Sequence, residues 1–179
     1  MALAPQDFIA PLIRNVGAYL VRGYRPRDLF TQYMAKGTSP TSGRDCNTHF
    51  GDVSRGVIAP ISMLGAMIPV MAGLGWARRH QGHDSVALTY IGDGGTSTGD
   101  FHEGLNLASV WKSPLILIGE HNQYAYSTPS ANQMAIRDLV DRELVMADFI
   151  PVKDSKIGEV RANFDIVVGR TPDERSLKN

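Results

Sequence analysis

Four residues near the middle of the chain have the chemistry of a metal-bound phosphate site. Asp93 offers a carboxylate, and Asn122, further along the chain, offers an amide oxygen. Hard oxygen ligands of this kind suit Mg²⁺, which is often shared with phosphate oxygens. The backbone amides of Gly94 and Gly95 can meet the negative charge of a phosphate, because glycine lets a ligand approach the backbone closely. These residues therefore predict a Mg²⁺–diphosphate site.

The segments around these residues are predicted to bring them together. Residues 86–91 and 115–118 are apolar and rich in β-branched or aromatic side chains, as expected of buried strands. Between them, residues 100–111 carry apolar side chains at helical spacing. Strand, helix and strand form a βαβ unit with two parallel strands. Ligands bind beyond the carboxyl ends of such strands, which is where both polar clusters fall.

Four segments of the sequence resemble one family of enzymes. They read GDGGTSTGDFHEGLNLASVWKSPLILI from position 92, QYAYSTP from 123, RDCNTHFGD from 44 and GVIAPISMLG from 56. The Gly-Asp-Gly sequence followed by Asn122 resembles the thiamine diphosphate motif. The surrounding segments resemble the alpha subunit of the decarboxylating component of 2-oxo acid dehydrogenase complexes.

The resemblance implies an α/β fold of the thiamine diphosphate-binding type, a parallel sheet flanked by helices, here partial. By resemblance, Asp93 and Asn122 supply side-chain oxygens to Mg²⁺, and Tyr124 supplies its carbonyl oxygen. His49 aligns with a family histidine near the thiazolium ring, which makes it the predicted catalytic residue. His121 departs from the family, which usually has asparagine there. The other predicted cofactor-binding positions are Arg14, Ser62, Leu64, Gly92, Gly94 and Gly95.

The activity implied by the resemblance is the oxidative decarboxylation of a 2-oxo acid, with transfer of the acyl group to a lipoyl group. The implied cofactors are thiamine diphosphate and Mg²⁺. The implied partners are a beta subunit, with which the chain forms a heterotetramer, and a lipoyl-bearing acyltransferase. Transketolase-like and decarboxylase-like thiamine proteins share the Gly-Asp-Gly and asparagine core but lack the surrounding segments.

A second hypothesis is a truncated, non-catalytic remnant that binds only cofactor or partner subunits. Residues 1–142 are expected to form the thiamine diphosphate-binding domain, incomplete at both ends, and residues 143–179 a divergent tail. In the family a further catalytic histidine lies in a later loop. This chain has no counterpart, because all five histidines lie at or before position 121.

The first third of the chain is predicted to be helical and then irregular. An apolar stripe in residues 5–34 predicts two helices, the first beginning near Pro5 and the second at Pro26. Residues 36–56 are rich in Gly, Ser, Thr and Asp, which predicts a long loop. Loops of this length in a compact domain usually serve function or are disordered.

Residues 57–77 contain no charged side chain, which allows either a membrane span or a buried helix. Pro60 and Pro69 favour the buried helix, which is expected over residues 63–80 with Ser62 as its N-cap. Residues 132–146 predict a further helix, and residues 166–168 a short strand.

The composition excludes several classes of partner. Eighteen basic and eighteen acidic residues cancel, so the net charge favours neither nucleic acid nor an anionic membrane. The single Cys46 excludes an internal disulfide and fits a reducing compartment. No charged and then apolar leader opens the chain, and we expect a cytoplasmic protein.

Overall fold

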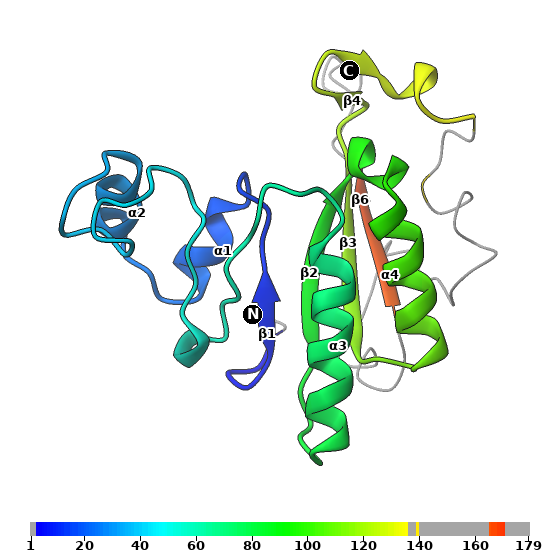
Figure 1. Ribbon diagram of the computed structural model, residues 1–179, viewed down its shortest axis with the longest axis horizontal. Coiled ribbons are helices and arrows are strands. Elements are labelled where there is room, and N and C mark those ends of the chain that lie inside the picture. Colours follow the sequence, from blue (N-terminus) through cyan, green and yellow to red (C-terminus); the bar gives the residue numbers. More distant parts are fainter. Residues whose placement is uncertain (1–2, 136–138, 140–164, 171–179) are drawn as a thin grey trace, which may run out of the picture.

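A computed structural model describes residues 3–135, 139 and 165–170 of the 179-residue chain. Its centre is a sheet of four parallel strands in the order β1-β2-β3-β6 (Figure 1). The strands are β1 (Phe8–Ala10), β2 (Ala87–Gly92), β3 (Leu115–His121) and β6 (Asp165–Arg170). A parallel sheet with flanking helices is the α/β class that the sequence predicts.

Helices α3 and α4 lie side by side against one face of the sheet, whereas α1 and α2 lie beyond β1 (Figure 1). The helices are α1 (Val16–Val21), α2 (Pro26–Tyr33), α3 (Met67–His80) and α4 (Gly99–Val110). Three 3₁₀ turns are η1 (Val53–Arg55), η2 (Asp93–Ser97) and η3 (Ser130–Asn132). A small hairpin joins β4 (Tyr124–Ala125) to β5 (Thr128–Pro129).

The predicted βαβ unit is confirmed as β2, α4 and β3. Alternate residues of the strands face opposite sides: Leu115 and Leu117 pack with α3 and α4, whereas Leu88 and Ile116 pack with the segments around α1. Because both faces are covered, the strands are apolar almost throughout. Strand β3 continues three residues beyond the predicted end at 118, which places His121 at its last position.

The first predicted helix is wrong over residues 5–15. The chain there forms β1 beside β2, and only Val16–Val21 is helical. The buried Asp7 explains the difference: its carboxylate accepts bonds from the N–H groups of Val86 (2.9 Å) and Ala4 (2.6 Å), which holds the segment alongside the sheet. Long-range pairing therefore overrides a local apolar pattern. The second helix, from Pro26, is confirmed.

Helix α3 begins at Met67, four residues later than predicted, and Ser62 is not its N-cap. In the preceding turn, Gly65 adopts a left-handed conformation (φ 86°), so the right-handed helix cannot extend back through this residue. Only one face of α3 is buried, since Val70 is 51% exposed and Trp76 is 37% exposed. Within the described residues, none of the helices has the length and apolarity that a membrane crossing requires.

The prediction of a strand at residues 166–168 is confirmed by β6, which pairs in parallel with β3. Most of the helix predicted for residues 132–146 lies outside the described residues. The same holds for most of the predicted tail, residues 143–179.

Candidate functional site

A cavity of about 590 Å³ opens at the carboxyl end of β2. Its apolar wall includes Leu12 in the turn before α1, Val16 at the start of α1 and Ile61 in the loop before α3. Eight residues predicted as cofactor or metal positions line it: Arg14, Ser62, Leu64, Gly92, Asp93, Gly94, Gly95 and Tyr124. Two predicted residues, His49 and Asn122, are not part of this lining.

Asp93 lies on the cavity wall at the first position of η2, immediately after β2. The residue is only 1% exposed, and its Oδ2 atom has no hydrogen-bond partner among the described residues. The ring of His121 lies close by: its Nε2 is 3.8 Å from Oδ2 and is itself without a hydrogen bond in the described part of the chain. A buried carboxylate is costly unless it is paired or coordinates a metal, so Asp93 fits a divalent cation.

Gly94 and Gly95 follow Asp93 where the backbone has no room for side chains. A Cβ on Gly94 would lie 2.6 Å from the Cβ of Ala125, and one on Gly95 would lie 2.5 Å from Cδ1 of Ile91. The side-chain amide of Gln133 donates to the Gly94 carbonyl (3.0 Å) and steadies the turn. The packing thus holds a bare backbone against the cavity, as a phosphate site requires.

Arg14 supplies the positive charge of the cavity. It lies in the turn before α1 rather than within a helix, and its Nε donates to Oε2 of Glu120 at 2.5 Å. Its terminal nitrogens lie against Gly92, where an added Cβ would meet Nη2 at 3.0 Å. An arginine held through Nε keeps its two terminal nitrogens for an anion.

The two remaining predicted metal ligands lie on the loop after β3. Asn122 is exposed, and its Oδ1 accepts a bond from the Tyr124 N–H at 3.0 Å. Tyr124 faces Pro129 in the hairpin, and proline has no N–H to donate to the Tyr124 carbonyl. Gln123 and Tyr126, on either side of Tyr124, both have positive φ (71° and 56°), so the hairpin holds them in an uncommon conformation for non-glycine residues.

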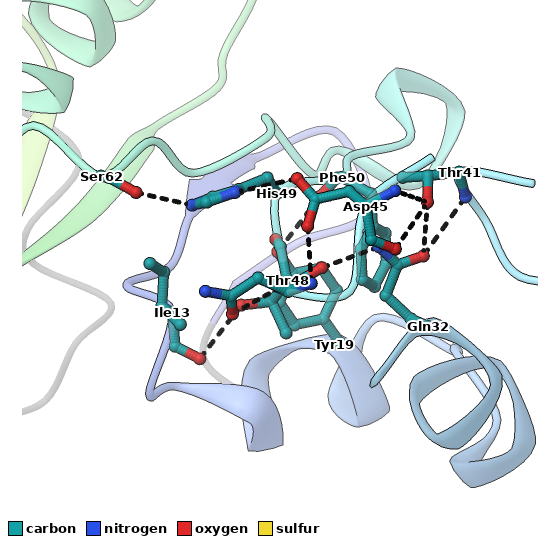
Figure 2. A network of polar contacts seen from close by, with 10 residues as sticks. Ile13, Tyr19, Gln32, Thr41, Asp45, Thr48, His49, Phe50 and Ser62 are labelled. Atoms are coloured by element: carbon teal, nitrogen blue, oxygen red, sulfur yellow. Dashed lines mark hydrogen bonds and ion pairs between the residues drawn. The ribbon is translucent and has the colours of Figure 1, made fainter. Parts of the chain in front are cut away.

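His49 reaches the cavity through Ser62. Its Nε2 lies 2.9 Å from Oγ of Ser62, and its Nδ1 lies 3.1 Å from Oδ2 of Asp45 (Figure 2). The Asn47 N–H, and after it the His49 ring, lower the pKa of the Asp45 carboxyl. The three side chains form an acid–base chain that ends at the cavity wall.

Buried polar side chains hold the loop that carries His49. Gln32, which is fully buried, donates to the carbonyls of Asp45 (3.1 Å) and Asn47 (2.8 Å) (Figure 2). The hydroxyl of Tyr19 donates to the Thr48 carbonyl at 2.8 Å and lies 3.1 Å from the Phe50 carbonyl. Residues 36–56 form the predicted loop. Side chains of neighbouring helices donate hydrogen bonds to its backbone carbonyl groups.

Sequence reasoning missed Asp45 and the role of Glu120. Neither has a local signal, because each matters through a contact with a residue of another segment. Asp45 lies four positions before His49, a spacing that has meaning in a helix but none in a loop. The contact between Glu120 and Arg14 spans 106 positions.

The donor set of the cavity fits Mg²⁺ bound together with a diphosphate. In the described part of the chain, no group of three or more His, Cys, Asp or Glu side chains is placed to hold a metal. A cation here therefore depends on Asp93, on amide or carbonyl oxygens and on ligand oxygens. This is the manner in which proteins usually bind Mg²⁺, through one or two carboxylates and substrate phosphates.

The fold is shared with a solved structure. The X-ray structure of a candidate thiamin diphosphate-dependent enzyme from Mycobacterium smegmatis superposes with a TM-score of 0.61 at 14% sequence identity. The match covers 96% of this chain and 30% of that one. The chain thus has the α/β fold of thiamin diphosphate-dependent enzymes.

Residues 1–152 match the Dehydrogenase E1 component family, and the chain belongs to it. The 2-oxoisovalerate dehydrogenase subunit alpha of Bacillus subtilis is 34% identical over 139 residues, 77% of this chain and 42% of that protein. The pyruvate dehydrogenase E1 component subunit alpha of Staphylococcus epidermidis is 34% identical over 145 residues, 80% of this chain and 36% of that protein. The chain spans less than half the length of these relatives.

Proposed function

We propose that the chain acts in the alpha subunit of a 2-oxo acid dehydrogenase and binds thiamin diphosphate through Mg²⁺ in the cavity after β2. The observation that carries the proposal is the buried, unpartnered carboxylate oxygen of Asp93 beside the bare backbone of Gly94 and Gly95. The terminal nitrogens of Arg14, at the same end of the cavity, would complete the charge balance of a metal-bound diphosphate.

The residues of the cavity would have different roles toward the cofactor. Asp93 would hold Mg²⁺, with the amide oxygen of Asn122 and the carbonyl of Tyr124 as further ligands. Ser62 and Leu64 would lie against the rings of the cofactor, and His49 would hold or move a proton through Ser62. When bound, thiamin diphosphate would supply the nucleophilic carbon and the electron sink that a decarboxylation needs.

The proposed reaction is the oxidative decarboxylation of a 2-oxo acid, with acyl transfer to a lipoyl-bearing acyltransferase in the cytoplasm. A beta subunit would complete the site. Exposed apolar side chains on the outer surfaces of α3 and α4, such as Val70, Trp76 and Val110, support an interface with another subunit. The relatives include enzymes named for 2-oxoisovalerate, pyruvate and acetoin, each as subunit alpha.

A second candidate function is cofactor or subunit binding without turnover. It is favoured by the position of His49, which does not line the cavity itself and contacts its wall only through Ser62. A turnover assay with a matching beta subunit and an artificial electron acceptor separates the two functions. Reduction of the acceptor upon addition of a 2-oxo acid would establish the enzyme, and binding without reduction would establish the second function.

Calorimetry of thiamin diphosphate with and without Mg²⁺ tests the cofactor site. The wild-type chain should bind in the presence of Mg²⁺ and lose most of its affinity without it. Asp93→Ala should abolish the effect of Mg²⁺, and Asn122→Ala should weaken it. Asp52→Ala, at a half-buried carboxylate that does not line the cavity, should leave it unchanged. Equal affinity of the wild type and both site variants would refute the metal assignment.

A further inference from the structure

Asp45, His49 and Ser62 form a chain of hydrogen bonds that ends at the cavity wall (Figure 2). We infer that Asp45 fixes which group donates and which accepts in each of these bonds. The Ser62 oxygen is thereby left as an acceptor toward the cavity, and it selects a ligand ring that carries an N–H donor. The inference rests on the proposed function for its choice of ligand, and it assigns Asp45 the role of a positioning residue.

The Asp45 carboxylate is held from two sides. Its Oδ1 accepts the Asn47 N–H at 2.6 Å, and its Oδ2 lies 3.1 Å from Nδ1 of His49. An ionised carboxylate can only accept hydrogen bonds, so the proton between Asp45 and His49 belongs to Nδ1. Gln32, fully buried, binds the Asp45 carbonyl at 3.1 Å and fixes the backbone from which the carboxylate extends.

The proton on Nδ1 determines the state of the other ring nitrogen. In a neutral imidazole with Nδ1–H, Nε2 carries a lone pair and accepts. Since Nε2 lies 2.9 Å from Oγ of Ser62, the hydroxyl donates its only proton to His49. The Ser62 oxygen then has only lone pairs left for the cavity that it lines.

The position of Ser62 along the cavity indicates which part of a ligand it meets. The anionic part is expected at Arg14 and the bare backbone of residues 92–95, whereas Ile61 and Leu64 beside Ser62 are apolar and suit a ring. A ring amino group can donate to the Ser62 oxygen. A ring carbonyl in the same place would face an acceptor and remain unpaired.

The variant Asp45→Asn reverses the chain of bonds. Its side-chain oxygen keeps the Asn47 N–H, so its NH₂ group must face Nδ1 of His49 and donate to it. The imidazole then carries its proton on Nε2 and donates to Ser62, whose hydroxyl turns its own proton toward the cavity. The charge changes, but the size and the loop contacts of the side chain stay the same.

Two measurements test the inference at about pH 8. Nitrogen-15 NMR of His49 in the ligand-free protein should show the Nδ1–H tautomer in the wild type and Nε2–H in Asp45→Asn. Calorimetry should compare thiamin diphosphate with oxythiamin diphosphate, in which a carbonyl replaces the ring amino group. Asp45→Asn should reduce the preference for thiamin diphosphate about two- to tenfold, the range of one neutral hydrogen bond.

Two further variants separate this role from a general disturbance of the loop. Asp52→Asn makes the same substitution at a half-buried carboxylate of the same loop that does not line the cavity, and it should change neither the tautomer nor the preference. In a Ser62→Ala background, Asp45→Asn should no longer alter the preference.

An Nε2–H tautomer in the wild type, or an unchanged tautomer in Asp45→Asn, overturns the inference whether or not a ligand binds. A reversed tautomer with an unchanged preference overturns its ligand part. If neither compound binds the wild type, the proposed function is contradicted. The NMR measurement needs no ligand, so it still tests the role of Asp45.

Discussion

Arg14 is paired with Glu120 through Nε, at 2.5 Å, and this bond determines which edge of the guanidinium faces the cavity. The side chain of Asn15 donates to the other carboxylate oxygen of Glu120 at 2.5 Å, so the carboxylate is held from two sides. The contact joins the turn before α1 to the end of β3. Burial, and after it the charge of Glu120, raises the pKa of the neighbouring Tyr90.

Arg14→Lys should bind Mg²⁺–thiamin diphosphate at least about tenfold more weakly than the wild type. A lysine has a single ammonium group and cannot keep Glu120 while offering two donors to a diphosphate. Hydrogen bonds to charged groups contribute roughly 1.5–3 kcal/mol each, which sets the size of the loss. Calorimetry of the wild type, Arg14→Lys and Arg14→Ala measures it.

The matched control for this prediction is Arg25→Lys, because Arg25 also pairs with a nearby carboxylate, Asp28, at 2.9 Å. Arg25 is exposed and does not line the cavity, so this variant should retain its affinity. If Arg14→Lys binds as tightly as the wild type, Arg14 acts only as a charge and its bond to Glu120 has no part in orientation.

Asp93→Asn should lose cofactor affinity without losing stability. The buried Oδ2 of Asp93 lacks a hydrogen-bond partner within the described residues, and an unsatisfied buried polar group costs about 1–3 kcal/mol. Removing its charge should therefore leave the free energy of unfolding of the ligand-free protein equal or higher. Urea unfolding without ligand measures this, and calorimetry measures the binding.

The comparison variant is Asp28→Asn, whose carboxylate accepts the Arg25 N–H at the start of α2. This change should lower stability, because it weakens a helix cap. A clear loss of stability in Asp93→Asn would show instead that the Asp93 carboxylate is paired in the free protein, with His121 as its partner at 3.8 Å.

The parts of the site with local signals were predictable from the sequence. Strands β2 and β3 are identified by apolar residues 86–91 and 115–118, because a strand buried on both faces needs apolar side chains throughout. The turn η2 is identified by the GDGG sequence, because a turn without room for side chains needs glycine. Arg14, Ser62 and Leu64 have no such local sequence signal, and their assignment to the cofactor site came from the family resemblance alone. The structure places all three on the cavity wall.

The contacts between segments could not be predicted. The stripe at residues 8–20 suits a helix, but its first part, Phe8–Ala10, is a strand beside β2, where Asp7 binds the backbone N–H of Val86. Ser62 looks like a helix cap before an apolar run, but its hydroxyl meets His49 instead. In each case a polar side chain pairs with a distant group, and no local periodicity records such a pair.

Gly94→Ala should lower the free energy of unfolding by about 1–3 kcal/mol, the typical cost of overpacking. The added Cβ would lie 2.6 Å from the Cβ of Ala125, so the hairpin must move away from η2. The double variant Gly94→Ala/Ala125→Gly should recover part of the loss. Chemical denaturation of the two variants and the wild type measures it.

Gly73→Ala serves as the control, since a Cβ there would meet nothing within 4 Å. Gly73 lies inside α3, where alanine is favoured over glycine by roughly 0.5–1 kcal/mol, so this variant should be more stable. If Gly94→Ala matches the wild type in stability and binding, the close approach of the hairpin does not require glycine at this position of η2.

The Tyr19 and Tyr24 rings should make stability fall at alkaline pH. Burial is the largest cause that raises the pKa of both hydroxyls, for Tyr24 from 10.0 to about 12. A folded-state pKa above the unfolded value means that the stabilising contribution is fully present below about pH 10. It is lost as the pH rises from 10 through the folded-state pKa, because the unfolded chain then releases its protons first.

Two phenylalanine variants separate the tyrosines. Tyr19→Phe removes the donor to the Thr48 carbonyl and should lower stability at neutral pH by about 1–3 kcal/mol. Tyr24→Phe removes a buried hydroxyl that has no partner among the described residues, so stability at neutral pH should be unchanged or higher. Both variants should flatten the alkaline decline, which urea unfolding at about pH 8 and about pH 11 measures. An equally steep decline in both variants would assign the alkaline loss to other groups.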